Sequence, residues 1–211
     1  MTRFNKFALA LGMALAFSAA AGAPEVETVL QRGFPTQASE LVKTTNKLHS
    51  EYKKQNNVSS LVFYSYGMLR LANHYKSVND VVNASEYAKL GFFWLDEAVD
   101  SHENDARVRY LRMRIDAYLP EELGRCVVAL NDANILLRQK ETWSDEIVAH
   151  INFMRYRALL SCKKDKQAAG LLEAMKNGGA VQARLLALGN GTPEWDASEV
   201  TQIVMPLVKG E

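Results

Sequence analysis

From Gln37 onward the apolar residues of this chain recur at the spacing of an amphipathic α-helix. No stretch shows the sustained apolar–polar alternation that predicts a β-strand. The pattern therefore predicts an all-α protein. It comprises a short helix, a long helix, three helix pairs, a second short helix and a final helix. The expected ranges are 25–32, 36–55, 58–76 with 84–101, 106–119 with 120–140, 145–161 with 165–177, a short helix to 188, and 196 to about 205.

Capping signals mark several of these boundaries. Residues 83–86 and 196–199 read Asn-Ala-Ser-Glu and Asp-Ala-Ser-Glu, the form of a capping box, in which the first side chain and the Glu satisfy free backbone amides. Pro120 suits a first helical position, where its missing N–H costs nothing. Ser144 precedes two acidic residues and predicts an N-cap. Pro206 is expected to end the final helix near Met205.

The middle helices carry two apolar faces rather than one. A helix with two such faces must be covered on two sides, so the pattern predicts stacked layers of helices. The second helices of the pairs begin about 40 residues apart, which is typical of repeated helical hairpins. On 84–101 one stripe comprises Ala84, Ala88, Phe92, Leu95 and Val99, and the other comprises Tyr87, Leu90 and Trp94.

The first residues have the pattern of a secretory signal peptide. Arg3 and Lys6 form a basic start, an apolar run covers 7–17, and small residues follow to Ala23. We expect cleavage after residue 21 rather than 23, because Pro24 would hinder the later site. The apolar run is shorter than the ~20 residues of a membrane-spanning helix. The expected mature protein is periplasmic or secreted, soluble and not inserted in the membrane.

Charge argues against two classes of partner. The mature chain would carry 23 basic and 24 acidic residues, since cleavage removes Arg3 and Lys6 from totals of 25 and 24. Such a balance does not favour nucleic-acid binding, which typically requires a strongly basic surface. It equally gives no support for recruitment to anionic membranes.

The two cysteines, Cys126 and Cys162, are expected to form a disulfide. Exported proteins retain disulfides, and an even number of cysteines fits that location. Cys126 lies early in one predicted helix and Cys162 at the end of the next. If consecutive helices run antiparallel, the start of one lies beside the end of the other, within the Cα separation of ~4.4–6.8 Å that a bridge needs.

Motifs for chemistry are missing from the sequence. The four histidines are scattered without HExxH spacing, and there is no nucleophile elbow, phosphate-binding loop or dinucleotide fingerprint. Asp100, His102, Glu103 and Asp105 cluster at a helix junction, but helix-capping acids in a solvated loop explain them. We therefore expect no catalytic residues, no metal and no cofactor, and a protein that is not an enzyme.

Small residues at expected helix crossings carry a resemblance to a known family. They are Gly67 with Ala88, Ala129, and Ala158 with Ala169, set among large apolar neighbours. Over residues 58–177 the chain resembles the tetratricopeptide-like superfamily, although the spacing exceeds its 34-residue unit and its Trp-Leu-Gly-Tyr signature and closing prolines are missing. A Sel1-like or irregular helical bundle remains the alternative.

The resemblance implies a short α-solenoid of stacked antiparallel helical hairpins. Its divisions would be a signal peptide (1–21), N-terminal helices (22–57), three hairpins (58–177) and C-terminal capping helices (178–211). The final helix is expected to cover the exposed face of the last repeat, because solenoids need caps. The first helices of the pairs would line a concave surface on which a partner protein segment docks.

The predicted groove residues are the aromatic, arginine and neighbouring side chains of those first helices. Such residue types are enriched at binding hot spots. We expect Arg112→Glu to weaken partner binding without changing the melting temperature. The predicted set is Tyr64, Met68, Tyr75, Arg109, Arg112, Asp116, Tyr156 and Arg157.

The sequence thus indicates a protein-interaction module, such as an adaptor, assembly factor or chaperone of a bacterial envelope or secretion system. Two non-catalytic alternatives are an immunity or inhibitor protein against one toxin or envelope enzyme, and a structural subunit of a larger assembly. A cell-wall hydrolase is the catalytic alternative. Nothing in the sequence identifies the partner.

Overall fold

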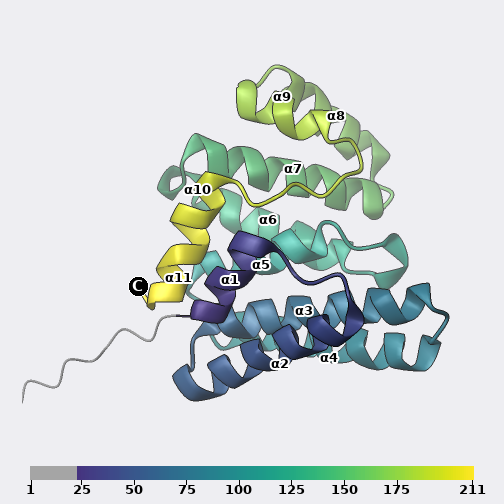
Figure 1. The fold of residues 1–211 in the computed structure, drawn as a ribbon. Helices are drawn as coiled ribbons and strands as arrows, with labels where there is room; N and C mark the ends of the chain where they lie inside the picture. The colour runs from purple at the N-terminus through teal and green to yellow at the C-terminus, as the bar shows by residue number, and fades with distance from the viewer. Residues whose placement is uncertain (1–22) are drawn as a thin grey trace, which may run out of the picture.

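The computed structural model describes residues 23–211, and these are α-helical without a β-strand (Figure 1). The predicted signal peptide, residues 1–21, lies outside the described residues. The α-helices are α1 (Pro24–Arg32), α2 (Ala38–Gln55), α3 (Val58–Ser77), α4 (Val81–Asp100), α5 (Ala106–Asp116), α6 (Cys126–Arg138), α7 (Asp145–Ser161), α8 (Asp165–Lys176), α9 (Ala180–Ala187), α10 (Ala197–Glu199) and α11 (Met205–Lys209).

Three short helical segments of other types lie between these elements. Two are 3-10 turns, η1 (Glu121–Leu123) and η2 (Lys140–Thr142), and one is a π-helical segment, η3 (Val200–Val204). Within residues 23–211, no helix combines the length and the apolar character needed to cross a membrane.

Consecutive helices pack against one another and build a stack. It runs from α2, α3 and α4 through α5 and α6 to α7, with α8 and α9 at the far end (Figure 1). The helices at the two ends of the described chain do not follow this sequential packing. The segment from α10 to α11 contacts α3, α5 and α7, and α1 contacts α2 and α3. The final helical segment therefore lies along the first helices of all three predicted pairs, and not on the last repeat alone as expected.

The first helix of each predicted pair forms the inner layer of the molecule. On α3, thirteen of twenty residues are buried, on α5 eight of eleven, and on α7 eight of seventeen. Residues on both predicted apolar faces of α5 and of α7 are thus buried. Helix α4 differs, because its buried residues are Gly91, Leu95, Ala98 and Val99, all in its second half.

The first half of α4 is exposed because its neighbour is short. Helix α5 has 11 residues and α3 has 20, a difference of about 13 Å at 1.5 Å per residue. The far end of the α3–α4 hairpin therefore extends past α5. Val81 and Val82 are 73% and 74% exposed there. Of the predicted stripes in this half of α4, Ala84, Tyr87 and Ala88 are only half-buried, while Leu90 is 42% exposed.

Two predicted helix starts are displaced. Helix α4 begins at Val81, because Asp80 caps it by accepting a hydrogen bond from the Asn83 amide at 3.1 Å, so the capping box predicted at 83–86 is wrong. Pro120 does not begin a helix that continues through 140 either. It precedes the turn η1, and Gly124 then adopts a positive φ of 68° before α6 begins at Cys126.

Other predicted boundaries are confirmed. Ser144 caps α7 by accepting a hydrogen bond from the Ile147 amide, and Asp196 with Glu199 forms a complete capping box.

Pro206 does not end the last helix, contrary to the prediction. The backbone is π-helical over η3 and continues as α11 to Lys209. A wider helical segment before a proline accommodates the missing N–H and the ring.

Close helix approach depends on two glycines. A Cβ added at Gly67 would lie 2.5 Å from Thr45 Oγ1 of α2, and one at Gly91 would lie 2.8 Å from Leu69 of α3. Ser65 Oγ also donates to the Gly91 carbonyl at 2.7 Å. Gly67 therefore serves the crossing of α2 with α3, and Gly91 the crossing of α3 with α4.

The predicted disulfide is confirmed. Cys126 and Cys162 are bonded, with their Cα atoms 5.6 Å apart. Cys126 is the first residue of α6 and Cys162 is the C-cap of α7, so the two helices are antiparallel and linked at one end.

Candidate functional site

A cavity of about 970 Å³ opens along α3, from Val62 to Ser77. Six other parts of the chain enclose it: Leu41 of α2, the start of α4, one face of α5, the turn 118–123, the loop 33–37 and residues 192–195 before α10. We call this cavity the groove. It lies where α3 and α4 extend past the short helix α5. On α3 the lining follows one helical face at Val62, Tyr66, Arg70, Asn73 and Ser77.

The groove lining carries basic residues and no acidic residue. Its charged side chains are Arg70, Lys76, Lys89 and Arg114, accompanied by His74. The chain as a whole is nearly balanced, with 25 basic and 24 acidic residues, so this one-sided lining is a local property. Most of the remaining lining is apolar, including Leu69, Ile115 and Leu119. The groove can therefore accept a ligand that is both apolar and negatively charged.

Arg70 is the cation at the middle of the groove. Its guanidinium carbon lies 5.6 Å from the ring centre of Phe34 and 5.8 Å from that of Tyr66, within cation–π distance of both. The two rings contact each other edge to face, with centres 5.2 Å apart. Arg70 Nε is buried and has no hydrogen-bond partner, and no carboxylate of residues 23–211 pairs with this side chain.

Arg114 forms another wall of the groove and is already paired. Its Nε donates to Glu199 Oε1 at 2.8 Å, and its Nη2 donates to the Pro193 carbonyl at 2.9 Å. The guanidinium carbon lies 3.8 Å from the ring centre of Trp195. Tyr110 also donates to Glu199 Oε1, at 2.8 Å. These contacts fix residues 193–199 against α5, so the wall containing Trp195 is firmly held.

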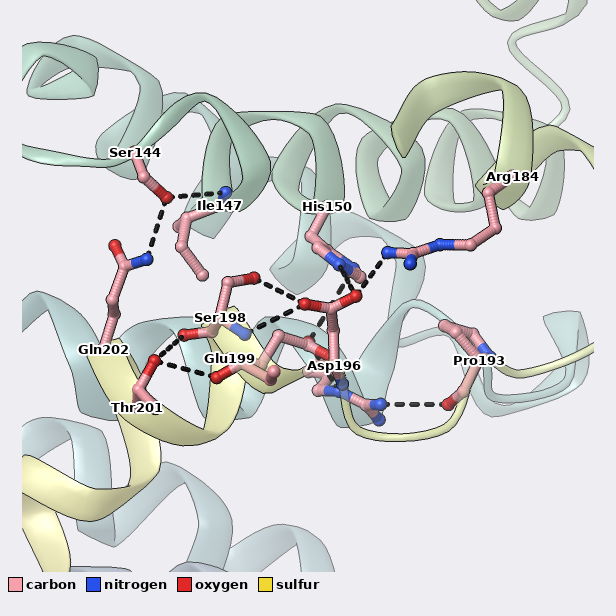
Figure 2. Close-up of polar contacts among 12 residues, drawn as sticks. Ser144, Ile147, His150, Arg184, Pro193, Asp196, Ser198, Glu199, Thr201 and Gln202 are labelled. Carbon is pink, nitrogen blue, oxygen red and sulfur yellow. Dashed lines mark hydrogen bonds and ion pairs between the residues drawn. The ribbon is translucent and has the colours of Figure 1, made fainter. Parts of the chain in front are cut away.

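His150 of α7 lies behind this wall, as Figure 2 shows. Its Nδ1 is 3.9 Å from Glu199 Oε1 and its Nε2 is 3.7 Å from Asp196 Oδ2, where Nε2 is buried without a hydrogen bond. Burial lowers the pKa of His150, although the two carboxylates oppose the shift. Asp196 also pairs with Arg184 of α9 (Figure 2). Gln202 Nε2 donates to Ser144 Oγ at 2.9 Å, which ties η3 to the start of α7.

Three predicted groove residues lie elsewhere, in a buried network of ion pairs between α4, α5 and α6. Arg112 donates to Asp132 from Nε at 2.8 Å and from Nη2 at 2.9 Å, and to Asp96 from Nη1 at 3.2 Å. Arg109 donates to the same Asp132 at 2.9 Å. The Asp132 side chain is fully buried, so both guanidinium groups balance a charge inside the protein.

Arg125 extends this network to Asp116, the third predicted residue. It donates to both oxygens of Asp116, at 2.9 and 2.8 Å, and to both oxygens of Asp96, at 2.9 and 2.8 Å. Burial raises the pKa of Asp116 to about 7, against the opposing effect of Arg125. Burial also acts to raise the pKa of Asp96, but Arg125 and Arg112 outweigh it and hold that pKa below its usual value.

The other five predicted residues also pack within the protein. Tyr64 is buried and stacks on His49 with ring centres 4.5 Å apart, and Met68 is buried beside it on α3. Tyr75 stacks on Tyr87 at 5.1 Å. Tyr156 packs against the core from α7, half-buried. Arg157 donates to the Gly189 carbonyl at 2.6 Å and lies 5.8 Å from the ring centre of Tyr118.

None of the eight predicted residues lines the groove. The difference is one of helix face. The groove uses Tyr66 where the prediction has Tyr64, and Arg114 where it has Arg112. Two residues correspond to a rotation of about 200° around an α-helix, so the prediction falls on the opposite side of α3 and α5.

The fold and the groove thus define an all-α, disulfide-linked protein with a basic, largely apolar groove. Comparison with protein-family models, with curated proteins and with solved structures gives no match to this chain. Among residues 23–211, no group of three or more His, Cys, Asp and Glu side chains gathers as metal ligands would.

Proposed function

We propose that this chain is an exported helical-repeat protein that binds a segment of a partner protein in the groove. It would act as an adaptor, assembly factor or chaperone in a bacterial envelope or secretion system. In this proposal the helix pairs are tetratricopeptide-like and the groove is the part of their concave surface that α1 and the α10–α11 segment leave uncovered. The disulfide supports export, because such bonds persist in oxidising compartments.

The groove itself carries the proposal. It is preformed, since Trp195 on one wall is held through Arg114 and Glu199, and its floor belongs to the buried helix α3. A rigid apolar groove loses little entropy when a segment binds. Its aromatic and arginine side chains, Tyr66, Tyr118, Trp195 and Arg70, are of the types enriched at binding hot spots.

The groove gives no support to the cell-wall hydrolase alternative. Most glycosidases place a pair of carboxyl groups on either side of the bond that they cleave. The groove lining contains neither Asp nor Glu. A binding role therefore fits this site better than hydrolysis of a polymer.

Two adjacent residues of α4 allow a sharp test. Ser85 and Glu86 are both exposed, and Ser85 lines the groove while Glu86 does not. A photo-crosslinking amino acid at position 85, in the cells that produce the protein, is expected to yield an adduct with one specific protein. The same amino acid at position 86 is the matched control and is expected to yield none.

A binding measurement with the purified partner completes the test. Ala88 lines the groove and is half-buried, so Ala88→Phe is expected to fill the groove and to lower the affinity at least about 10-fold. Glu86→Phe adds the same side chain on the outer face and is expected to leave binding unchanged. Equal adducts from positions 85 and 86, or equal affinities for the two Phe variants, would contradict the proposal.

A further inference from the structure

We propose that the groove recognises an extended segment in which an Asp or Glu side chain lies between apolar side chains, and that Arg70 binds its carboxylate. This inference rests on the proposed function and specifies the chemistry of the partner segment.

The charge of the groove lining is the first step. Arg70, Lys76, Lys89 and Arg114 face a ligand without any acidic residue beside them in the lining. Two of these cations already have partners, since Arg114 pairs with Glu199 and Lys76 pairs with Glu122 at 2.8 Å. Like-charge contact disfavours a basic segment, and an acidic one gains from the same field. The lining therefore selects a negatively charged occupant.

The state of Arg70 is the second step. Phe34 and Tyr66, which contact each other, both lie within cation–π distance of its guanidinium, so the side chain is already ordered before a ligand binds. Its Nε is buried and lacks a hydrogen-bond partner. A guanidinium presents its donors as a planar fork that matches a carboxylate, and the charge-assisted pair is among the stronger hydrogen bonds. The buried Nε is out of reach of a ligand, but no hydrogen bond or ion pair within residues 23–211 uses Nη1 or Nη2, and a carboxylate in the groove can accept from these two nitrogens.

The position of Arg70 along the groove is the third step. The lining on α3 runs from Val62 to Ser77, which corresponds to about 22 Å at 1.5 Å per residue. Arg70 lies at the middle of that length. A segment that fills the groove in extended form needs about six or seven residues at ~3.3 Å each. Its charged group then lies inside the segment, which makes it an acidic side chain rather than a terminal carboxylate.

Apolar lining residues flank Arg70 toward both ends of the groove. Val62 and Phe63 of α3 lie toward one end of the groove. Val81, the first residue of α4, and Leu119, which follows α5, line it outside α3. Apolar side chains of the segment on both sides of the acid would be removed from water against these surfaces. The predicted segment is therefore apolar, then acidic, then apolar.

Synthetic heptapeptides test the inference. They are acetylated and amidated to remove terminal charge, vary over Ala, Val, Leu, Phe, Ser and Thr at six positions, and carry Glu, Gln or Lys at the centre. Binding is measured by fluorescence anisotropy on the mature, oxidised protein. The best Glu-centred peptide is expected to bind about 10- to 100-fold more tightly than its Gln counterpart, as expected for one hydrogen-bonded charge pair. The Lys counterpart is expected to bind more weakly still.

Variants of Arg70 assign the effect to this residue. Arg70→Gln is expected to bind the Glu and Gln peptides equally, and Arg70→Lys to keep part of the preference. Lys89→Gln removes an exposed cation of the same groove, and this variant is expected to retain most of the preference for the Glu peptide. Melting curves of all variants confirm folding. Glu-centred and Gln-centred peptides that bind equally to the unmodified protein would overturn the inference, as would an undiminished preference in Arg70→Gln.

Two further probes separate other ligands. A preference for uncharged heptapeptides with a free C-terminal carboxylate would overturn the internal position of the acid. Oleate that binds the groove while every peptide fails would overturn the inference in favour of a lipid anion. If the peptides fail and the adduct from position 85 persists, the proposed function stands and the acidic-segment inference does not.

Discussion

Arg112 illustrates how strongly the role of a single side chain depends on which helix face it occupies. The residue type of Arg112 and its place on the first helix of a pair made it a candidate for partner binding. In the structure it is buried and shares Asp132 with Arg109. The structure therefore leads us to expect that Arg112→Glu lowers stability rather than leaving it unchanged, because that variant places a new carboxylate beside Asp96 and Asp132.

We expect Arg112→Glu to lower the free energy of unfolding by at least about 3–5 kcal/mol, the usual cost of removing one partner from a buried ion pair. Urea unfolding of the oxidised mature protein measures this. Arg138→Glu is the control, because Arg138 is exposed near the end of α6 without an ion pair, and a change within about 0.5 kcal/mol is expected. A similar small change for Arg112→Glu would refute the structural role of the network.

His150 makes stability depend on pH. Its pKa in the folded chain lies below the 6.5 of a free histidine because the side chain is buried. Below pH 6.5 the unfolded chain binds a proton that the folded chain resists, so stability falls as the pH drops toward the folded pKa. The loss approaches about 1.4 kcal/mol per pH unit in that range.

His150→Gln is expected to remove this slope. Urea unfolding of both proteins between pH about 5 and 8 measures it, and only the difference between the two curves is used, because Asp116 titrates in both. At about pH 8 the histidine is neutral in both states and the difference is expected to be constant. Curves that remain parallel down to about pH 5 would show that His150 does not titrate differently on folding.

The candidate site was partly predictable at the residue scale. The residue types, aromatic and arginine on the first helices, are those that line the groove. Their face was not predictable, because Tyr64 and Tyr66 both lie on apolar arcs of α3 and the sequence does not say which arc packs on α2 and α4. Phe34, which contacts Arg70, lies in a loop 36 residues earlier in the chain, where no periodic spacing marks it.

At the scale of the elements, the sequence predicted those helix boundaries that are set by a capping residue and its immediate neighbours. Helix α7 covers Asp145–Ser161, the predicted range, because Ser144 caps it through its own neighbours. The start of α4 was missed, since Asp80 caps it after Asn79 takes a positive φ of 60°, and Asn83 offered an equally good local signal. The end of α5 at Asp116 was also missed, and the groove owes its existence to that early end.

The disulfide between α6 and α7 is expected to stabilise the chain by about 3.8 kcal/mol, from the lost entropy of a closed loop of about 37 residues. The measurement compares urea unfolding of the oxidised and the reduced protein. The double variant Cys126→Ala with Cys162→Ala is the control, and reductant is expected to leave its stability unchanged. Equal stability of the oxidised and reduced protein would show that helix packing alone holds these ends together.

On the scale of the whole molecule, both ends of the described chain pack on the first helices of the pairs, which were expected to line a surface free for a partner. Asn57 Nδ2 donates to the carbonyls of Leu207 and Val208, both at 3.0 Å, across 150 residues or more. Arg107 donates to the Gln202 carbonyl at 3.3 Å. Contacts at such separation leave no periodic trace in a sequence, which is why this cover could not be predicted.

We expect deletion of residues 200–211 to destabilise the protein by at least about 4 kcal/mol. The segment buries Ile203, Val204, Leu207 and Val208 almost completely, and each such side chain contributes about 1.5–3 kcal/mol. Urea unfolding, together with binding of a hydrophobic dye to the uncovered face, measures the effect. Deletion of residues 210–211 alone is the control and should change neither readout. If deletion of residues 200–211 also changed neither stability nor dye binding, the segment would be dispensable for the fold.

The start of α1 and the end of α11 lie at the same edge of the stack (Figure 1). The groove runs along α3 from Val62 to Ser77, toward the hairpin tip. A tether at either terminus would therefore hold the molecule by the same edge. On a sensor chip or a bead, both orientations would present the binding face to the solution. A short linker between the two termini, with new ends cut at the hairpin tip near Asn79, would instead place the tether next to the groove.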